Sequence, residues 1–139
     1  MDKQPKMDDL IGRRFVNGGR ELITGLDCWG LVMEVYRRYG LTIPDFTVGA
    51  FAFQTIDALA REAMESRIWE RVHELNDKDV PLVVLMRMHP KLITHVGVYM
   101  GHNRIIHTMK MTGIITSRAS ALKSRIVGYY RYVQDNQHT

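Results

Sequence analysis

The sequence contains one cysteine, Cys28, among 139 residues. A single thiol cannot form a disulfide within the chain, and it cannot build a zinc site made of several cysteines. Cys28 is therefore either a small buried side chain or a functional thiol.

Long apolar segments are also missing. The longest apolar run, residues 80–86, contains a proline and is far shorter than the ~20 residues of a bilayer-spanning helix. The first ten residues, MDKQPKMDDL, are too polar for the apolar core of a secretory signal peptide. We expect neither a membrane span nor an export signal.

Charge gives little guidance on partners. Lysine and arginine number 19 against 15 acidic residues, and the basic residues form no block of five or six. Nucleic acid is therefore not expected as a partner, whereas an acidic cell-wall polymer would suit the mild positive charge. With 45% hydrophobic and 24% charged residues, the chain is expected to be one soluble globular domain spanning residues 1–139.

The first half of the chain has helical periodicity. Apolar residues recur at helical spacing over residues 28–39, after Asp27 as an N-cap and before Gly40 as a stop. A second helix is expected from about Ala50 to Arg67, with its apolar stripe at Ala52, Ile56, Leu59, Ala60 and Ala63.

The second half has the pattern of short strands. We predict strands at residues 82–86, 94–100, 104–109, 113–117 and 126–133, with a hairpin turn at residues 101–103. Helices followed by strands predict an α+β fold, in which the N-terminal helices pack on one side of an antiparallel sheet.

Cys28 occupies the first turn of the first predicted helix. The unpaired N–H groups of a helix N-terminus stabilise a thiolate and can bind an oxyanion. We therefore expect Cys28 to have a lowered pKa and to react readily at neutral pH. The alternative is a buried cysteine without a function, which is the commoner role of a free cysteine.

A thiol nucleophile needs a base, and two histidines lie within predicted strands. His95 and His107 would face each other directly if the hairpin were centred on Gly101, and a loop centred between Gly101 and His102 would put them on opposite faces. Four other histidines lie in polar or turn-like stretches and are expected to be solvated: His73, His89, His102 and His138.

These residues supply the parts of a papain-like mechanism. His95 would take the thiol proton, and His107 would hold His95 in its tautomer and orientation. One cysteine and two histidines could instead bind zinc, although no further ligand spacing supports that alternative.

The motifs together resemble the NlpC-type family of bacterial cell-wall cysteine peptidases, which have a compact papain-like fold. The order and spacing of five segments carry the resemblance: residues 15–20 (FVNGGR), 26–32 (LDCWGLV), 95–99 (HVGVY), 105–108 (IIHT) and 128–131 (GYYR). The resemblance implies Cys28 as nucleophile, His95 as base and His107 as the orienting residue.

The resemblance also implies a substrate. The expected reaction is hydrolysis of amide bonds in the peptide stems of peptidoglycan, without a metal or other cofactor. Asp27, Trp29 and Phe15 would line the substrate and oxyanion site. The family usually has tyrosine where Phe15 stands and often serine where Trp29 stands, so this chain lacks a hydroxyl beside the thiol and carries a bulky indole.

The Asp-Cys-Trp-Gly version resembles the branch found in tail-assembly and tail-tip proteins of bacteriophages. We therefore expect a virion protein with tail-tip partners, made in the host cytoplasm without a signal peptide and acting in the periplasm. Two alternatives are a structural tail-tip component with a weak or inactive site, and an amidase or acyltransferase that uses the same three residues.

Overall fold

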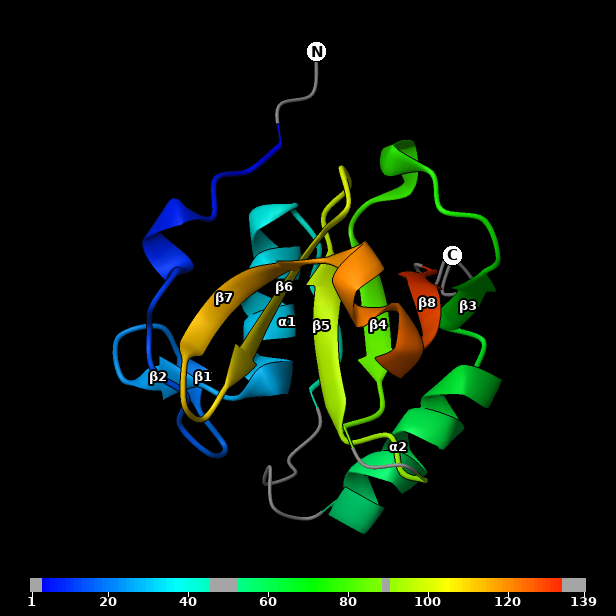
Figure 1. The fold of residues 1–139 in the computed structure, drawn as a ribbon, viewed down its shortest axis with the longest axis horizontal. Helices are drawn as coiled ribbons and strands as arrows, with labels where there is room; N and C mark the ends of the chain where they lie inside the picture. Colours follow the sequence, from blue (N-terminus) through cyan, green and yellow to red (C-terminus); the bar gives the residue numbers. More distant parts are fainter. Residues whose placement is uncertain (1–3, 46–52, 89–90, 134–139) are drawn as a thin grey trace, which may run out of the picture.

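The computed structural model describes residues 4–45, 53–88 and 91–133. Its centre is a six-stranded antiparallel sheet with the strand order β3-β8-β4-β5-β6-β7 (Figure 1). The strands are β3 (Trp69–Val72), β4 (Leu82–Met86), β5 (His95–Tyr99), β6 (Arg104–Met109), β7 (Gly113–Arg118) and β8 (Ile126–Tyr132). A small separate sheet pairs β1 (Arg20–Glu21) with β2 (Gly25–Leu26).

The described residues also form two helices and three short 3₁₀ segments. The helices α1 (Cys28–Arg38) and α2 (Phe53–Glu65) belong to one apolar cluster with one face of the sheet. The 3₁₀ segments are η1 (Asp8–Leu10), η2 (Asp77–Asp79) and η3 (Ala119–Arg125). A second cluster, which includes Ala119 and Leu122 of η3, covers the other sheet face (Figure 1). The predicted α+β fold is therefore confirmed.

The strand predictions hold to within one residue at each end, and β5 is one residue shorter at both ends than predicted. The structure has β4 and β6 at the predicted residues, because five and four of their residues respectively are buried. The α2 helix ends two residues before the predicted Arg67, and the predicted start at Ala50 lies outside the described residues. The edge strand β3 was not predicted, because its two central residues are exposed and charged, and among the described strands it pairs with β8 alone.

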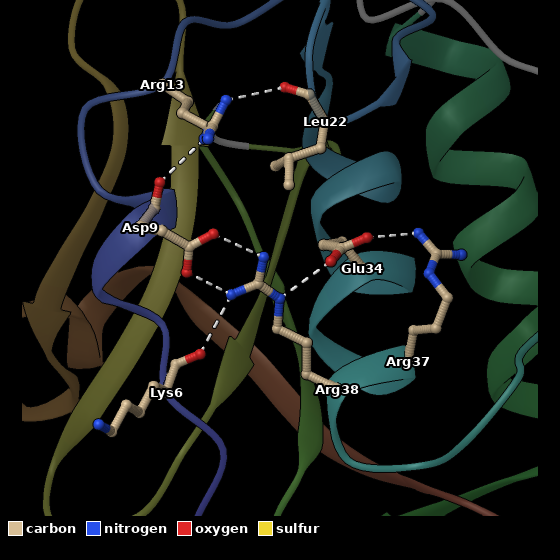
Figure 2. A network of polar contacts seen from close by, with 7 residues as sticks. All are labelled: Lys6, Asp9, Arg13, Leu22, Glu34, Arg37 and Arg38. Atoms are coloured by element: carbon tan, nitrogen blue, oxygen red, sulfur yellow. Dashed lines mark hydrogen bonds and ion pairs between the residues drawn. The ribbon is translucent and has the colours of Figure 1, made fainter.

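An ion-pair network fastens the N-terminal segment to α1 (Figure 2). Arg38 donates two hydrogen bonds to the Asp9 carboxylate, at 2.6 and 2.9 Å, and one to Glu34 at 2.9 Å. Arg13 donates to the Asp9 carbonyl and to the Leu22 carbonyl. The segment before the first sheet is thereby held against the last turns of α1.

None of the helices in the described part of the chain is long and apolar enough to cross a bilayer. The apolar residues of α1 lie on one side instead, where Leu31, Val32 and Val35 are fully buried against the sheet. This one-sided pattern places the start of α1, and with it Cys28, at the edge of the core.

Candidate active site

The register between β5 and β6 decides whether the two histidines meet. Val98 pairs with Ile106 and Tyr99 with Ile105, so the hairpin is centred on His102. The predicted centre at Gly101, with direct opposition of the imidazoles, is therefore wrong by one residue. His95 and His107 are still on the same face, as diagonal neighbours.

The turn itself explains the shift in register. Gly101, His102 and Asn103 all have positive φ, at 87°, 53° and 62°, and asparagine tolerates this conformation better than most residues. The Asn103 side chain also bonds both the backbone N–H and the hydroxyl of Ser120. All three residues thus belong to a loop whose last residue is bonded to η3.

The two imidazoles are hydrogen-bonded to each other. Nε2 of His95 lies 2.8 Å from Nδ1 of His107, and Nε2 of His107 lies 2.8 Å from Oγ of Ser117 on β7. His95 and His107 are 7% and 2% exposed. The result is a chain of three polar groups that crosses three neighbouring strands, in which both imidazoles are buried and Ser117 is half-buried.

Gly97 makes the close approach of these strands possible. A Cβ at this position would lie 2.8 Å from the Ile106 carbonyl oxygen and 3.0 Å from Cβ of His107. Both distances are too short for ordinary contacts, so a side chain at residue 97 would push β6 and its histidine away.

Burial keeps both imidazoles neutral. It lowers the pKa of His95 to about 3, and the neighbouring His107 adds to the effect. Burial also lowers the pKa of His107. At neutral pH each ring therefore carries one proton and has one nitrogen free to accept another.

Asp27 fixes the start of α1. Its Oδ1 accepts the Gly30 N–H at 2.8 Å and an Arg20 N–H at 2.6 Å, and its Oδ2 accepts the Gly18 N–H at 3.1 Å. The carboxylate is 2% exposed, which such pairing makes tolerable. The predicted N-cap is confirmed, while a contact between Asp27 and substrate stays a prediction.

The glycine pair at residues 18–19 seats a turn against the first turn of the helix. A Cβ on Gly30 would lie 2.2 Å from the carbonyl oxygen of Gly19. The Gly19 carbonyl also accepts the Asp27 N–H at 3.2 Å. The backbones at residues 19 and 30 therefore pack directly on each other and fix the position of the residues between Asp27 and Gly30.

The Cys28 thiol is buried, at 9% exposure. Burial raises its pKa to about 12, and the Asp27 carboxylate adds to the rise. The backbone N–H groups of Trp29 and Cys28 and the Arg20 guanidinium favour the thiolate, but these contributions are smaller. The prediction of a lowered pKa is therefore wrong for the resting protein, because burial outweighs the helix N-terminus.

The start of α1 lies close to the histidine-bearing strands. The helix contacts both β5 and β6, and in Figure 1 its N-terminal end lies behind the point where these two strands diverge. Within the described residues, the hydrogen bonds of the imidazoles go to each other and to Ser117, and the Cys28 thiol is not among their partners.

No three His, Cys, Asp or Glu residues of the described part are grouped to hold a metal.

Trp29 and Phe15 border this region. The Trp29 indole donates to the Pro44 carbonyl at 3.0 Å and packs edge-on against Trp69. Phe15 is half-buried and forms a bridge with Leu26. Their predicted contacts with substrate stay predictions.

Two of the other four histidines lie in the described residues. His73 and His102 are exposed, as expected, and His89 and His138 lie outside the described residues. A cavity of about 480 Å³ lies elsewhere on the molecule, and β3, η3 and β8 contribute most of its lining.

Sequence reasoning missed Ser117 and Arg20. Ser117 pairs with Ile105 across the β6–β7 ladder, which makes it the diagonal neighbour of His107. The register of the second hairpin was the signal that could have identified it. Arg20 belongs to the glycine-pair segment, but only the folded chain brings it to Asp27.

The comparison with protein families agrees with this geometry. The sequence profile described as the NlpC/P60 family matches residues 12–131, which include Cys28, His95 and His107. The chain belongs to the NlpC/P60 family. Members of this family are usually cysteine peptidases of the cell wall.

Solved structures show the same fold. An NLP/P60-family protein of Staphylococcus aureus, described as similar to a lipoprotein, matches with a TM-score of 0.58 and 20% identity over 97% of this chain and 46% of its own. NlpC2 from Trichomonas vaginalis matches with a TM-score of 0.61 and 15% identity over 92% of this chain and 44% of its own. The chain thus spans less than half the length of both structures. None of the curated protein sequences compared with it matches.

Proposed function

We propose that this NlpC/P60 domain is a cysteine peptidase that hydrolyses amide bonds in the peptide stems of peptidoglycan. The observation that carries the proposal is the buried His95–His107 pair, in which Nε2 of His95 lies 2.8 Å from Nδ1 of His107. The two histidines belong to β5 and β6, and α1 contacts both strands. Family membership supports cell-wall peptide as the substrate class.

In the proposed mechanism, His95 accepts the proton of the Cys28 thiol as the sulfur attacks the amide carbonyl. Burial favours a neutral thiol and a neutral imidazole before the reaction. Proton transfer creates the two charges together and side by side, which costs less than creating either one alone in a dry site. His95 then protonates the leaving amine, and water releases the acyl group from sulfur.

The start of α1 supplies the oxyanion site. The Gly30 N–H donates to Asp27, whereas the backbone N–H groups of Cys28 and Trp29 favour the thiolate form of Cys28. These two groups are in position to donate to an oxygen that becomes negative beside the sulfur. Asp27 acts by fixing this turn of the helix, and Trp29 and Phe15 form the border of the substrate site.

We further propose that the protein works in a phage or prophage tail and acts in the periplasm. The Asp-Cys-Trp-Gly form of the nucleophile motif supports this setting, because it resembles the tail-tip branch of the family. Mass spectrometry of purified tail particles tests it. Recovery of the chain with tail proteins is expected, and its consistent absence from the particles would contradict the assignment.

A structural tail-tip role is the second candidate. The raised pKa of Cys28, and a thiol that is not among the hydrogen-bond partners of the described imidazoles, favour a weak or inactive site. Phe15, which lacks the hydroxyl that the family usually places beside the thiol, favours it as well.

Digestion of purified peptidoglycan separates the two candidates. The wild-type protein is expected to release soluble fragments that mass analysis identifies by their new amino and carboxyl ends. Cys28→Ala should abolish release, and His95→Ala should slow it by about 10²–10⁴-fold. His73→Ala is the matched control, because this exposed histidine lies away from the pair. Release that persists in Cys28→Ala, or its absence in the wild type, would refute the peptidase proposal.

A further inference from the structure

We infer that Ser117 is a positioning residue that sets the tautomers of His107 and His95 and thereby leaves His95 able to act as a base. The inference rests on the proposed function for its catalytic meaning. Its structural content, the protonation pattern of two buried rings, can be measured without any substrate.

One ring nitrogen of His95 remains available to the thiol. Its Nε2 is engaged by His107 at 2.8 Å, so Nδ1 is the ring nitrogen left to receive a proton from Cys28. A neutral imidazole with a bare Nδ1 carries its proton on Nε2. His95 must therefore donate that proton to Nδ1 of His107.

The tautomer of His95 fixes the tautomer of His107. If Nδ1 of His107 accepts, its proton is on Nε2, which lies 2.8 Å from the Ser117 hydroxyl. The hydroxyl oxygen has lone pairs to receive that N–H. The order His95 to His107 to Ser117 thus runs in one direction, and every donor has an acceptor.

The reverse order would disable the base. In it Ser117 donates to Nε2 of His107, His107 donates from Nδ1 to Nε2 of His95, and His95 is protonated on Nδ1. That nitrogen then has no lone pair for the thiol proton. The direction of the chain is consequently the difference between a competent and an incompetent base.

Replacement of the serine hydroxyl removes the protein acceptor that faces His107. The His107 side chain is 2% exposed, and Oγ of Ser117 is the protein group that lies 2.8 Å from its Nε2. In Ser117→Ala, an N–H on Nε2 would point at a methyl group, and buried N–H donors without acceptors are rarer in proteins than underused acceptors. The variant is therefore expected to shift His107 toward the Nδ1-protonated tautomer.

Two variants of β7 provide a matched comparison. Ser117→Thr keeps the hydroxyl and adds a methyl group on a strand that tolerates branched side chains. Thr116→Ala removes a hydroxyl from the residue before Ser117. Thr116 is exposed, and because side chains alternate along a strand it lies on the sheet face opposite to Ser117.

Nitrogen-15 NMR of ring-labelled histidine is the test. In the wild type we expect His95 and His107 to be protonated on Nε2. Ser117→Ala should move His107 toward Nδ1 protonation, and Ser117→Thr and Thr116→Ala should keep the wild-type pattern. Protonation of His107 on Nδ1 in the wild type would overturn the inference, even if Ser117→Ala failed to fold.

Kinetics on peptidoglycan stems provide a second readout. Ser117→Ala should lower kcat by about tenfold to a hundredfold, which is part of the 10²–10⁴-fold that a positioned general base contributes. KM should be unchanged, and Ser117→Thr should keep the wild-type kcat. If kcat and the ring pattern of Ser117→Ala both match the wild type, Ser117 has no positioning role. If the wild type cuts nothing but shows the expected ring pattern and its shift in Ser117→Ala, the tautomer assignment stands and the peptidase proposal falls.

Discussion

Cys28 shows how a single residue can have the right position and an unexpected charge state. Its place after an N-cap is visible in the sequence, but its burial depends on segments distant in the chain, including β5 and β6. That burial raises its pKa to about 12. The resting protein therefore holds a thiol, and thiolate forms when a proton acceptor and a substrate are both in place.

The first prediction concerns alkylation of Cys28 by iodoacetamide. In the folded protein, modification at pH 7 should be slow and should rise only at strongly alkaline pH, because the reagent reacts with the thiolate. The same chain unfolded in urea is the control and should follow an ordinary thiol with a pKa of ~8.5. Faster modification of the folded than of the unfolded chain at pH 7 would disprove the raised pKa.

Gly97→Ala tests the close contact between β5 and β6. The new Cβ would meet the Ile106 carbonyl and Cβ of His107, so we expect a loss of ~1–3 kcal/mol of unfolding free energy and changed ring signals of both histidines. Urea unfolding and histidine NMR measure these effects. Gly40→Ala is the control. A Cβ at residue 40 would contact nothing, but the backbone there has φ +85°, which alanine rarely adopts. This variant should therefore lose stability without changing the ring signals of the histidines.

At the scale of elements, the start of α1 is held by a cap that belongs to three segments. Asp27 joins the first turn of the helix to Gly18 and to Arg20 of β1. The helix N-terminus is thus positioned by tertiary contacts as well as by its own sequence. Movement of this cap would move Cys28, the next residue.

We expect Asp27→Ala to lower the free energy of unfolding by about 2 kcal/mol, because it removes the N-cap bond and leaves Arg20 with fewer partners. Asp27→Asn should cost less, since asparagine is also a good N-cap. Chemical denaturation monitored by circular dichroism gives both values. Equal stability of the wild type and the alanine variant would show that the cap contributes little.

On the scale of the whole molecule, the N-terminal segment is attached to α1 by charge. The hydrogen bonds from Arg38 lower the pKa of Asp9 from 3.8 to about 2. A carboxyl group whose folded pKa is depressed stabilises the fold above its unfolded pKa, and that stabilisation is lost as the pH falls through the folded value.

Asp9→Asn should therefore lower Tm at pH 7, and its difference from the wild type should shrink between about pH 4 and pH 2. The effect is expected to be small because the pair is partly exposed. Thermal unfolding at pH 7, 4 and 2 measures it. Asp8→Asn, which changes the neighbouring exposed residue, is the control, and a difference that grows toward pH 2 would contradict the assigned contact.

Local sequence patterns were enough to identify the first helix, five strands of the sheet and the reactive side chains. Periodicity placed α1 after Asp27 and placed β4 and β6 at their observed residues, because alternation and capping are properties of neighbouring residues. The same local signals identified Cys28, His95 and His107.

The connections between those groups and their charges depend on contacts between distant segments. The β5–β6 hairpin is centred on His102, and Asn103 of its turn bonds Ser120 of η3, a contact that neighbouring residues do not reveal. Ser117 lies next to His107 because of the register of the β6–β7 hairpin. Cys28 is buried because it packs in one cluster with residues of distant strands. Register, burial and pKa all depend on segments far apart in the chain, and for that reason local patterns did not reveal them.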